Sequence, residues 1–135
     1  MTPDEARAEL EAAFIAAFVP AHPEADYFID GVSEPDFETQ SKPFAFLSVG
    51  LPRHEQSGFN GDAPPKRYYG EIEIGLFVRD GQGTRPFFLM SRTVENSLTV
   101  RTITAITLRG MTPMKRTSAL GWQGRLLVIP YQFDS

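Results

Sequence analysis

Apolar residues recur at helical spacing near the start of the chain. They lie three or four positions apart and so form one stripe of a helix: Ala6, Leu10, Ala13, Phe14, Ala17 and Phe18. Thr2 is suited to the N-cap and Pro3 to the first turn, with acidic residues beside the helix dipole. We expect the helix to end at Val19, because a residue that precedes proline disfavours helical geometry.

Alternation of apolar and polar residues is clearest over residues 67–79. One face carries Tyr68, Gly70, Ile72, Ile74, Leu76 and Val78, and the other is mostly polar and includes Glu71 and Glu73. This period of two predicts a strand of a sheet that is covered on one side. A turn follows at residues 80–83. Thr84 is then expected to cap a second helix whose buried stripe is Phe87, Met90, Val94 and Leu98.

Three further stretches predict strands. Residues 44–51 are apolar and are closed by Pro52, and residues 100–108 form a β-branched run. Residues 122–133 form a long final strand in which residues 126–129 suggest burial on both faces. Pro130 places its end at an edge or a bulge. A shorter strand-like piece lies at 26–31.

This order of elements indicates an α+β fold with a mostly antiparallel, or mixed, sheet and two helices packed on one face. The 135 residues are the size of one domain. Residues 20–43 form an acidic, proline-punctuated connector, and residues 110–121 a loop. Residues 53–66 form a long flexible loop, whose length suggests function or local disorder.

Charge is unevenly divided along the chain. The first 65 residues hold 12 acidic and 3 basic side chains, whereas the remaining residues hold 5 acidic and 10 basic ones. Ten of the acidic residues precede residue 39, on the first helix and the connector. The acidic and basic side chains could intermix in the folded chain, so that their charges cancel. Their division by structural element instead favours separate surfaces on which copies of the chain dock.

Composition excludes several classes of protein. The chain has no cysteine, which excludes disulfides, thiolate nucleophiles and cysteine-ligated metals. No apolar run approaches the roughly 18 residues of a membrane span, and the acidic start does not fit a signal peptide. We therefore expect a soluble intracellular protein, or part of a particle assembled inside a cell, without a membrane partner. A pI near 5.1 disfavours extensive nucleic-acid binding.

Catalytic groups are few. His22 and His54 both lie in loop-forming sequence, where exposed histidines are typical, and no nucleophile motif is present. Glu71 and Glu73 share one face of a strand and could serve acid–base chemistry, although such pairs usually form a solvated face. We expect no enzyme and no cofactor.

Two other patterns fail as ligand sites. The acidic residues between Asp26 and Glu38 do not follow a calcium-loop pattern, because Phe28 stands where the second acid belongs. The turn Asp80-Gly81-Gln82-Gly83 lacks the further glycine or lysine of a phosphate-binding loop.

Short motifs along the chain resemble those of a known family. They are Arg67-Tyr68-Tyr69-Gly70-Glu71-Ile72-Glu73-Ile74-Gly75-Leu76-Phe77-Val78, Gly81-Gln82-Gly83-Thr84-Arg85, Gly121-Trp122 and Ile129-Pro130-Tyr131. In order and spacing they resemble the tail terminator (tail completion) proteins of long-tailed, non-contractile bacteriophages and related particles. Residues 20–43 match no family motif.

The resemblance implies a structural role. Such proteins form a hexameric ring that caps the tail tube, stops its polymerisation and presents a surface to the head–tail connector protein. It implies a homo-hexamer in the virion tail, assembled in the host cytoplasm, with the tube and connector proteins as partners. DNA would then be only passing cargo.

Basic and aromatic residues supply the candidate contacts of such a ring. Because aromatic residues and arginine are enriched at interfaces, the candidates are Arg53, Phe59, Lys66, Arg67, Lys115 and Arg116. A channel for DNA would have an acidic or neutral lining, to which Glu71 and Glu73 could contribute. The alternative is a small-molecule or peptide binding module, with a pocket lined by Tyr68, Phe77 and Trp122.

Overall fold

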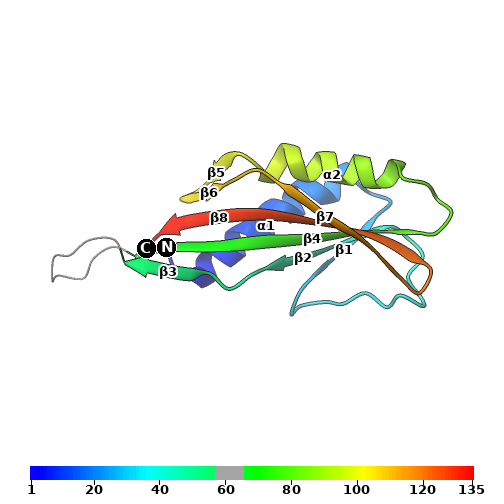
Figure 1. Cartoon of the computed structure of the whole chain (residues 1–135), viewed down its shortest axis with the longest axis horizontal. Helices are drawn as coiled ribbons and strands as arrows, with labels where there is room; N and C mark the ends of the chain where they lie inside the picture. Colours follow the sequence, from blue (N-terminus) through cyan, green and yellow to red (C-terminus); the bar gives the residue numbers. More distant parts are fainter. Residues whose placement is uncertain (57–65) are drawn as a thin grey trace.

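The computed structural model describes residues 1–56 and 66–135, which form two helices and one sheet (Figure 1). The helices are α1 (Pro3–Ala21) and α2 (Arg85–Leu98). The strands are β1 (Asp26–Ile29), β2 (Phe44–Val49), β3 (Arg53–Gln56), β4 (Lys66–Arg79), β5 (Arg101–Ile103), β6 (Ile106–Leu108), β7 (Thr112–Ala119) and β8 (Trp122–Asp134).

The eight strands follow the order β1-β2-β4-β8-β6-β5, with β3 added beside β4 and β7 beside β8. The pair of β1 and β2 is parallel and every other described pair is antiparallel. The long strands β4 and β8 run side by side through the molecule (Figure 1). The predicted α+β fold with a mostly antiparallel, mixed sheet is therefore confirmed.

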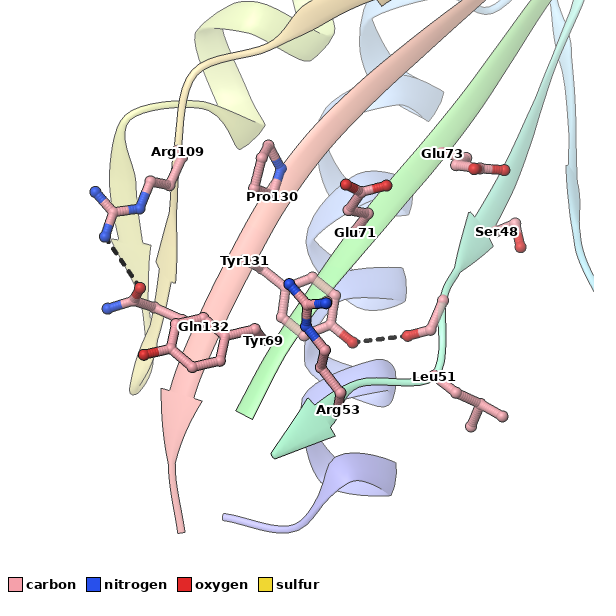
Figure 2. A pocket seen from close by; sticks show the side chains of 12 residues that line it. Ser48, Leu51, Arg53, Tyr69, Glu71, Glu73, Arg109, Pro130, Tyr131 and Gln132 are labelled. Atoms are coloured by element: carbon pink, nitrogen blue, oxygen red, sulfur yellow. Dashed lines mark hydrogen bonds between the residues drawn. The ribbon is translucent and has the colours of Figure 1, made fainter. Parts of the chain in front are cut away.

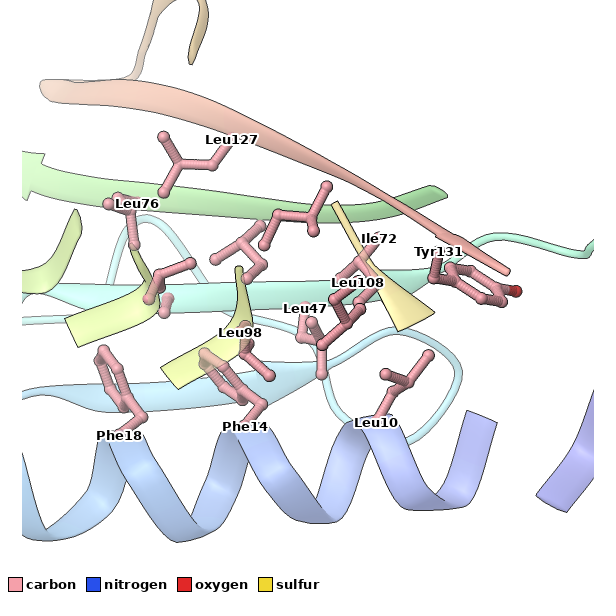
Figure 3. Close-up of a cluster of buried hydrophobic side chains, with 14 of the residues drawn as sticks. Leu10, Phe14, Phe18, Leu47, Ile72, Leu76, Leu98, Leu108, Leu127 and Tyr131 are labelled. Carbon is pink, nitrogen blue, oxygen red and sulfur yellow. The ribbon is translucent and has the colours of Figure 1, made fainter. Parts of the chain in front are cut away.

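Both helices cover the same face of the sheet and bury the main core against it. Helix α1 directs Leu10, Phe14 and Phe18 toward the strands (Figure 3). Helix α2 buries its whole predicted stripe, and the inward positions of β4 are buried from Ile72 to Val78. The alternation read from the sequence thus assigns the two faces of β4 correctly.

Helix α1 starts as predicted and ends later than predicted. The Thr2 hydroxyl accepts a hydrogen bond from the Glu5 amide at 3.2 Å, and the Glu5 carboxylate accepts one from the Thr2 amide. The helix continues through Pro20 to Ala21. Because Pro20 lies in the final turn, its missing amide costs only a terminal hydrogen bond. Neither helix in the described residues is long and apolar enough to cross a membrane.

Helix α2 begins at the predicted place without the predicted capping bond. Thr84 occupies the N-cap, but its backbone is already helical and its side chain makes no capping hydrogen bond. Gly81 and Gly83 both adopt positive φ angles in the preceding turn, a conformation that glycine adopts without steric cost.

Three segments differ from their prediction. The run 100–108 is a hairpin of β5 and β6 instead of one strand, because the chain turns at Thr104 with a φ of 54°. The predicted loop 110–121 contains β7, which pairs along β8. Strand β2 ends at Val49, two residues earlier than predicted.

The predicted loop 53–66 is shorter than expected at both ends. Arg53–Gln56 form β3 against β4, and Lys66 already belongs to β4. The interior of that predicted loop, residues 57–65, lies outside the described residues.

In β8, Leu127 and Ile129 are buried beneath the helices, whereas Leu126 and Val128 are half-buried on the other face. Pro130 lies where β7 has ended and β6 has begun, and its carbonyl accepts a hydrogen bond from the Arg109 amide. Because the N and C=O of one strand residue point to the same side, the missing Pro130 amide leaves the ladder with β4 intact. The predicted edge position is wrong, because β8 has β4 on one side and β6 and β7 on the other, and Pro130 occupies the break between β7 and β6.

Candidate functional site

The face of the sheet that points away from the helices divides into two ends. The outward positions near Trp122 are aromatic or glycine on β2, β4 and β8. Farther along the sheet they are polar on β2 and β4, at Ser48, Glu71 and Glu73, and apolar on β8. We call the first part the covered end, defined by Phe44, Phe77 and Trp122. The second is the groove end, defined by Ser48, Glu71 and Glu73.

Aromatic side chains build a second core at the covered end. The rings of Phe44 and Phe77 stack with centroids 4.9 Å apart, and Trp122 contacts Phe44 edge-on at 5.1 Å. Trp122 is completely buried, and its indole N–H donates to the carbonyl of Phe37 at 2.9 Å. The Phe37 ring closes the cluster from above, 5.6 Å from Phe77.

Phe77 explains two glycines on this face. A Cβ added to Gly75 or to Gly124 would lie 2.8 Å from the Phe77 ring. Real Cβ atoms do not approach other atoms so closely, so the ring lies flat only because both neighbours are glycine.

The part of the connector that follows β1, residues 30–43, covers this end. It brings Phe37 over the aromatic cluster, and the Gln40 carbonyl accepts a hydrogen bond from Arg79 at 2.7 Å. The Arg79 guanidinium also lies 4.7 Å from the centre of the Trp122 ring. A segment without a family motif thus has a clear structural task, which no local sequence pattern predicted.

The groove end is left uncovered by described residues and holds a shallow groove of about 520 Å³ (Figure 2). Glu71 and Glu73 project from β4 into it, beside Ser48 of β2. Both glutamates are exposed, as predicted for a solvated strand face. Arginines approach the groove from two sides, Arg53 from β3 and Arg109 from the segment after β6.

Two hydrogen bonds fix the walls of the groove. The Tyr131 hydroxyl donates to the Gly50 carbonyl at 2.8 Å, and Arg109 donates to the Gln132 side chain at 3.0 Å (Figure 2). Burial raises the pKa of the Tyr131 hydroxyl to about 12, so it remains a donor near neutral pH. The Tyr131 ring lies across Gly70, where an added Cβ would meet it at 2.5 Å.

Ion pairs among the described residues lie away from the two glutamates. They join Arg7 to Asp4 and Glu11 within α1, and Arg67 to Asp134 across β4 and β8. The hydrogen bond from Arg67, at 2.8 Å, lowers the pKa of the Asp134 carboxyl, and the carboxylate in turn raises the pKa of Arg67. Glu71 and Glu73 thus lie outside the described ion pairs and face solvent.

The predicted contact residues fall into two separate groups. Arg53, Lys66 and Arg67 lie together where β3 meets the start of β4. Lys115 and Arg116 lie on β7, near the other end of the sheet. Phe59 lies outside the described residues. The five candidates within the described residues therefore lie at two separate places on the sheet.

The two histidines differ from each other. His54 is exposed, as expected, although it lies in β3 and not in a loop. The expectation of an exposed His22 is wrong: it is half-buried, and its Nε2 lies 2.7 Å from the Thr93 hydroxyl of α2. Burial lowers the pKa of His22. The described part of the chain contains no group of three or more acidic or histidine side chains placed to hold a metal.

The pocket expected for a small-molecule binding module is not formed. Trp122 is sealed beneath Phe37, and Tyr68 lies near the opposite end of β4, where it stacks on Phe133. Phe37 is the residue of this face that no sequence pattern predicted. An isolated phenylalanine among acidic residues was the only available signal for it.

Comparison with known proteins identifies a shared fold. No family model matches the chain, and no curated protein matches its sequence. A solved protein that carries only an identifier as its name matches with a TM-score of 0.72 and 13% identity, over 98% of this chain and 96% of the other. A chain of the virion of a native gene transfer agent particle matches with a TM-score of 0.50 and 13% identity, over 96% of this chain and 91% of the other. At such identities the likeness shows the fold alone.

Proposed function

We propose that the chain is a structural virion protein that forms a ring at the end of a phage-type tail tube. The ring, a homo-hexamer, caps the tube, stops its polymerisation and offers the surface to which a head–tail connector protein binds. On this proposal the chain acts by assembly and catalyses no reaction.

The observation that carries the proposal is the fold shared with a component of a gene transfer agent virion, over nearly the whole of both chains. The sequence motifs add support from their positions. The double-glycine turn leads into α2, and Gly121-Trp122 starts the strand that anchors the covered end. These motifs thus hold the fold, while the exposed surfaces remain free to differ.

The groove end suits the wall of a channel through which DNA passes. Glu71 and Glu73 form a carboxylate stripe on the face opposite the helices, and no described ion pair neutralises them. Carboxylates repel the phosphate backbone, so DNA slides past without sticking. We therefore assign this face to the inside of the ring and the helices to its outside.

Tube assembly in the presence of the chain tests this function. Tube protein from the same particle is allowed to polymerise with and without the purified chain, and tube lengths are measured by electron microscopy. We expect substoichiometric chain to stop elongation and to appear as a ring at tube ends. Tubes that elongate equally in both samples, with bare ends, would refute the capping role.

A further inference from the structure

The covered end of the sheet finishes in two free edges, one on each side. Across this end the strands run β1, β2, β4, β8 and β7, as the register through Phe44, Phe77 and Gly124 shows. Strand β1 is therefore one edge and β7 is the other. Each copy of the chain presents both edges at the same level of its sheet.

The two edges carry opposite charge. Residues 24–38, which include β1 and the first part of the connector, contain six acidic side chains and no basic one. Residues 112–125, which include β7 and the first part of β8, contain three basic side chains, Lys115, Arg116 and Arg125, and no acidic one. We call residues 24–38 the acidic edge and β7, with Arg125 beside it, the basic edge.

Within the described residues, no ion pair neutralises either set. The ion pairs found in the described residues belong to α1 and to the Arg67–Asp134 contact, and none joins the acidic edge to the basic edge. Glu34 and Glu38 on one side and Arg116 on the other are exposed. Both charge sets are therefore available to a partner.

A pocket of about 310 Å³ lies on the basic edge, lined by Asp80, Arg116, Thr117, Ser118, Gln123 and Arg125. The guanidinium carbon of Arg125 lies 4.8 Å from the centre of the Phe87 ring of α2. Its Nη1 is buried and has no hydrogen-bond partner among the residues that the structure describes. A buried donor left without an acceptor is costly, so this pocket fits an incoming carboxylate that bonds Arg125 and pairs with Arg116.

We propose that this pocket receives an acidic side chain of the acidic edge of a second copy, and that this contact is the joint between neighbouring subunits of the ring. It rests on the proposed function, since a ring requires a contact between two different surfaces of the same chain. Because the edges lie on opposite sides of the sheet, every subunit can contribute its acidic edge to one neighbour and its basic edge to the other.

The joint is made by side chains and not by extending the sheet from copy to copy. At the free side of β1, the Ile29 carbonyl already accepts hydrogen bonds from the amides of Val32 and Ser33. The Ile29 amide donates to the Ser33 hydroxyl at 3.2 Å. The turn after β1 thus blocks a new strand, and the joint depends on charge, which makes it sensitive to salt.

Charge reversal on each edge tests the joint. The first variant, Arg116→Glu with Ser118→Glu, places two carboxylates at the pocket of the basic edge. The second, Glu34→Lys with Glu38→Lys, places two ammonium groups at the two exposed positions of the acidic edge. We expect each variant alone to associate about 100-fold more weakly than the wild type, since like charges then face each other. In a mixture, the intact edge of each variant can meet the intact edge of the other, and the two altered edges carry opposite charges. Assembly should therefore recover, as measured by light scattering after size-exclusion chromatography.

The matched controls are Arg92→Glu and Glu95→Lys, which reverse exposed charges on α2, and circular dichroism verifies the fold of every variant. We expect the controls to assemble like the wild type. If wild-type rings form and both charge-reversed variants still form them, or if mixing the variants does not restore assembly, the proposed joint is wrong but the proposed ring is not contradicted. If the wild type remains monomeric at every protein and salt concentration, both the ring and the joint are wrong.

Discussion

The covered end and the groove end share the same three strands and the same alternation, yet they form opposite kinds of surface. At the covered end, Phe44, Phe77 and Trp122 point outward and the connector closes over them. At the groove end, Ser48, Glu71 and Glu73 occupy equivalent outward positions and remain open. The outward residues therefore decide where the connector adds a third layer to the helices and the sheet.

This difference separates stability from function. Buried aromatic rings stabilise the covered end and hold the connector, so changes there should affect folding. Exposed carboxylates contribute little to folding, so changes at the groove end should affect only what the surface meets.

Loss of Trp122 should give the largest effect. Trp122→Ala removes a fully buried ring and leaves the Phe37 carbonyl without its donor, so we expect a loss of about 3–5 kcal/mol in the free energy of unfolding. Urea denaturation measures it. Phe88→Ala, which truncates a mostly exposed ring on α2, should change stability by less than about 0.5 kcal/mol. Equal losses in both variants would mean that Trp122 is not a core residue.

Filling a glycine under Phe77 should have the next largest effect. In Gly124→Ala, the new Cβ would meet the Phe77 ring at 2.8 Å and the Thr117 hydroxyl at 2.9 Å. We expect a loss of about 1–3 kcal/mol from the displaced ring. Gly110→Ala is the matched control, because an added Cβ there has open space. Thermal unfolding of the two variants should separate them clearly, and coincident curves would contradict the close packing of Phe77.

On the helix-covered side of the sheet, His22 should make a smaller contribution to stability than the glycine positions, and this contribution should depend on pH. Burial lowers its pKa in the folded chain, so the unfolded chain binds the proton more readily. Stability should therefore rise with pH through the range just below the ordinary pKa of 6.5 and be partly lost on acidification through it. His22→Gln should flatten that part of the profile in denaturation curves recorded between pH 5 and 8. If His22→Gln leaves the slope of stability against pH unchanged, the lowered pKa of His22 is not the cause of that slope.

Neutralising the groove end should have the smallest effect on folding. Glu71→Gln with Glu73→Gln removes two exposed charges, and we expect the free energy of unfolding to change by less than about 0.5 kcal/mol. The variant should bind double-stranded DNA more strongly than the wild type in low salt, as measured by fluorescence anisotropy. A large loss of stability would show that the carboxylates are structural after all.

Local pattern was sufficient to predict the elements whose residues alternate or recur regularly. Strand β4 and the buried stripes of both helices were readable because one face of each is apolar. Strand β7 was missed because its sequence has no apolar face, and its pairing depends on the neighbouring β8. The β5–β6 hairpin was hidden because a turn at Thr104 interrupts a uniformly β-branched run.

The site was predictable only in its polar part. Glu71 and Glu73 were correctly placed on one exposed face by their spacing. The cover over Trp122 depends on Phe37, which is 85 residues away along the chain, and such a contact leaves no local signal. The Arg116–Arg125 pocket depends on the register between β7 and β8 and was equally out of reach.

Cross-linking between single-cysteine variants tests most directly whether copies join through their two opposite edges. The chain has no cysteine, so Glu34→Cys marks the acidic edge and Ser118→Cys marks the basic edge without background. With a short bis-maleimide, we expect covalent dimers when the two variants are mixed, and monomers when either is treated alone. Dimers formed by one variant alone, or none in the mixture, would contradict a head-to-tail joint between the acidic and basic edges.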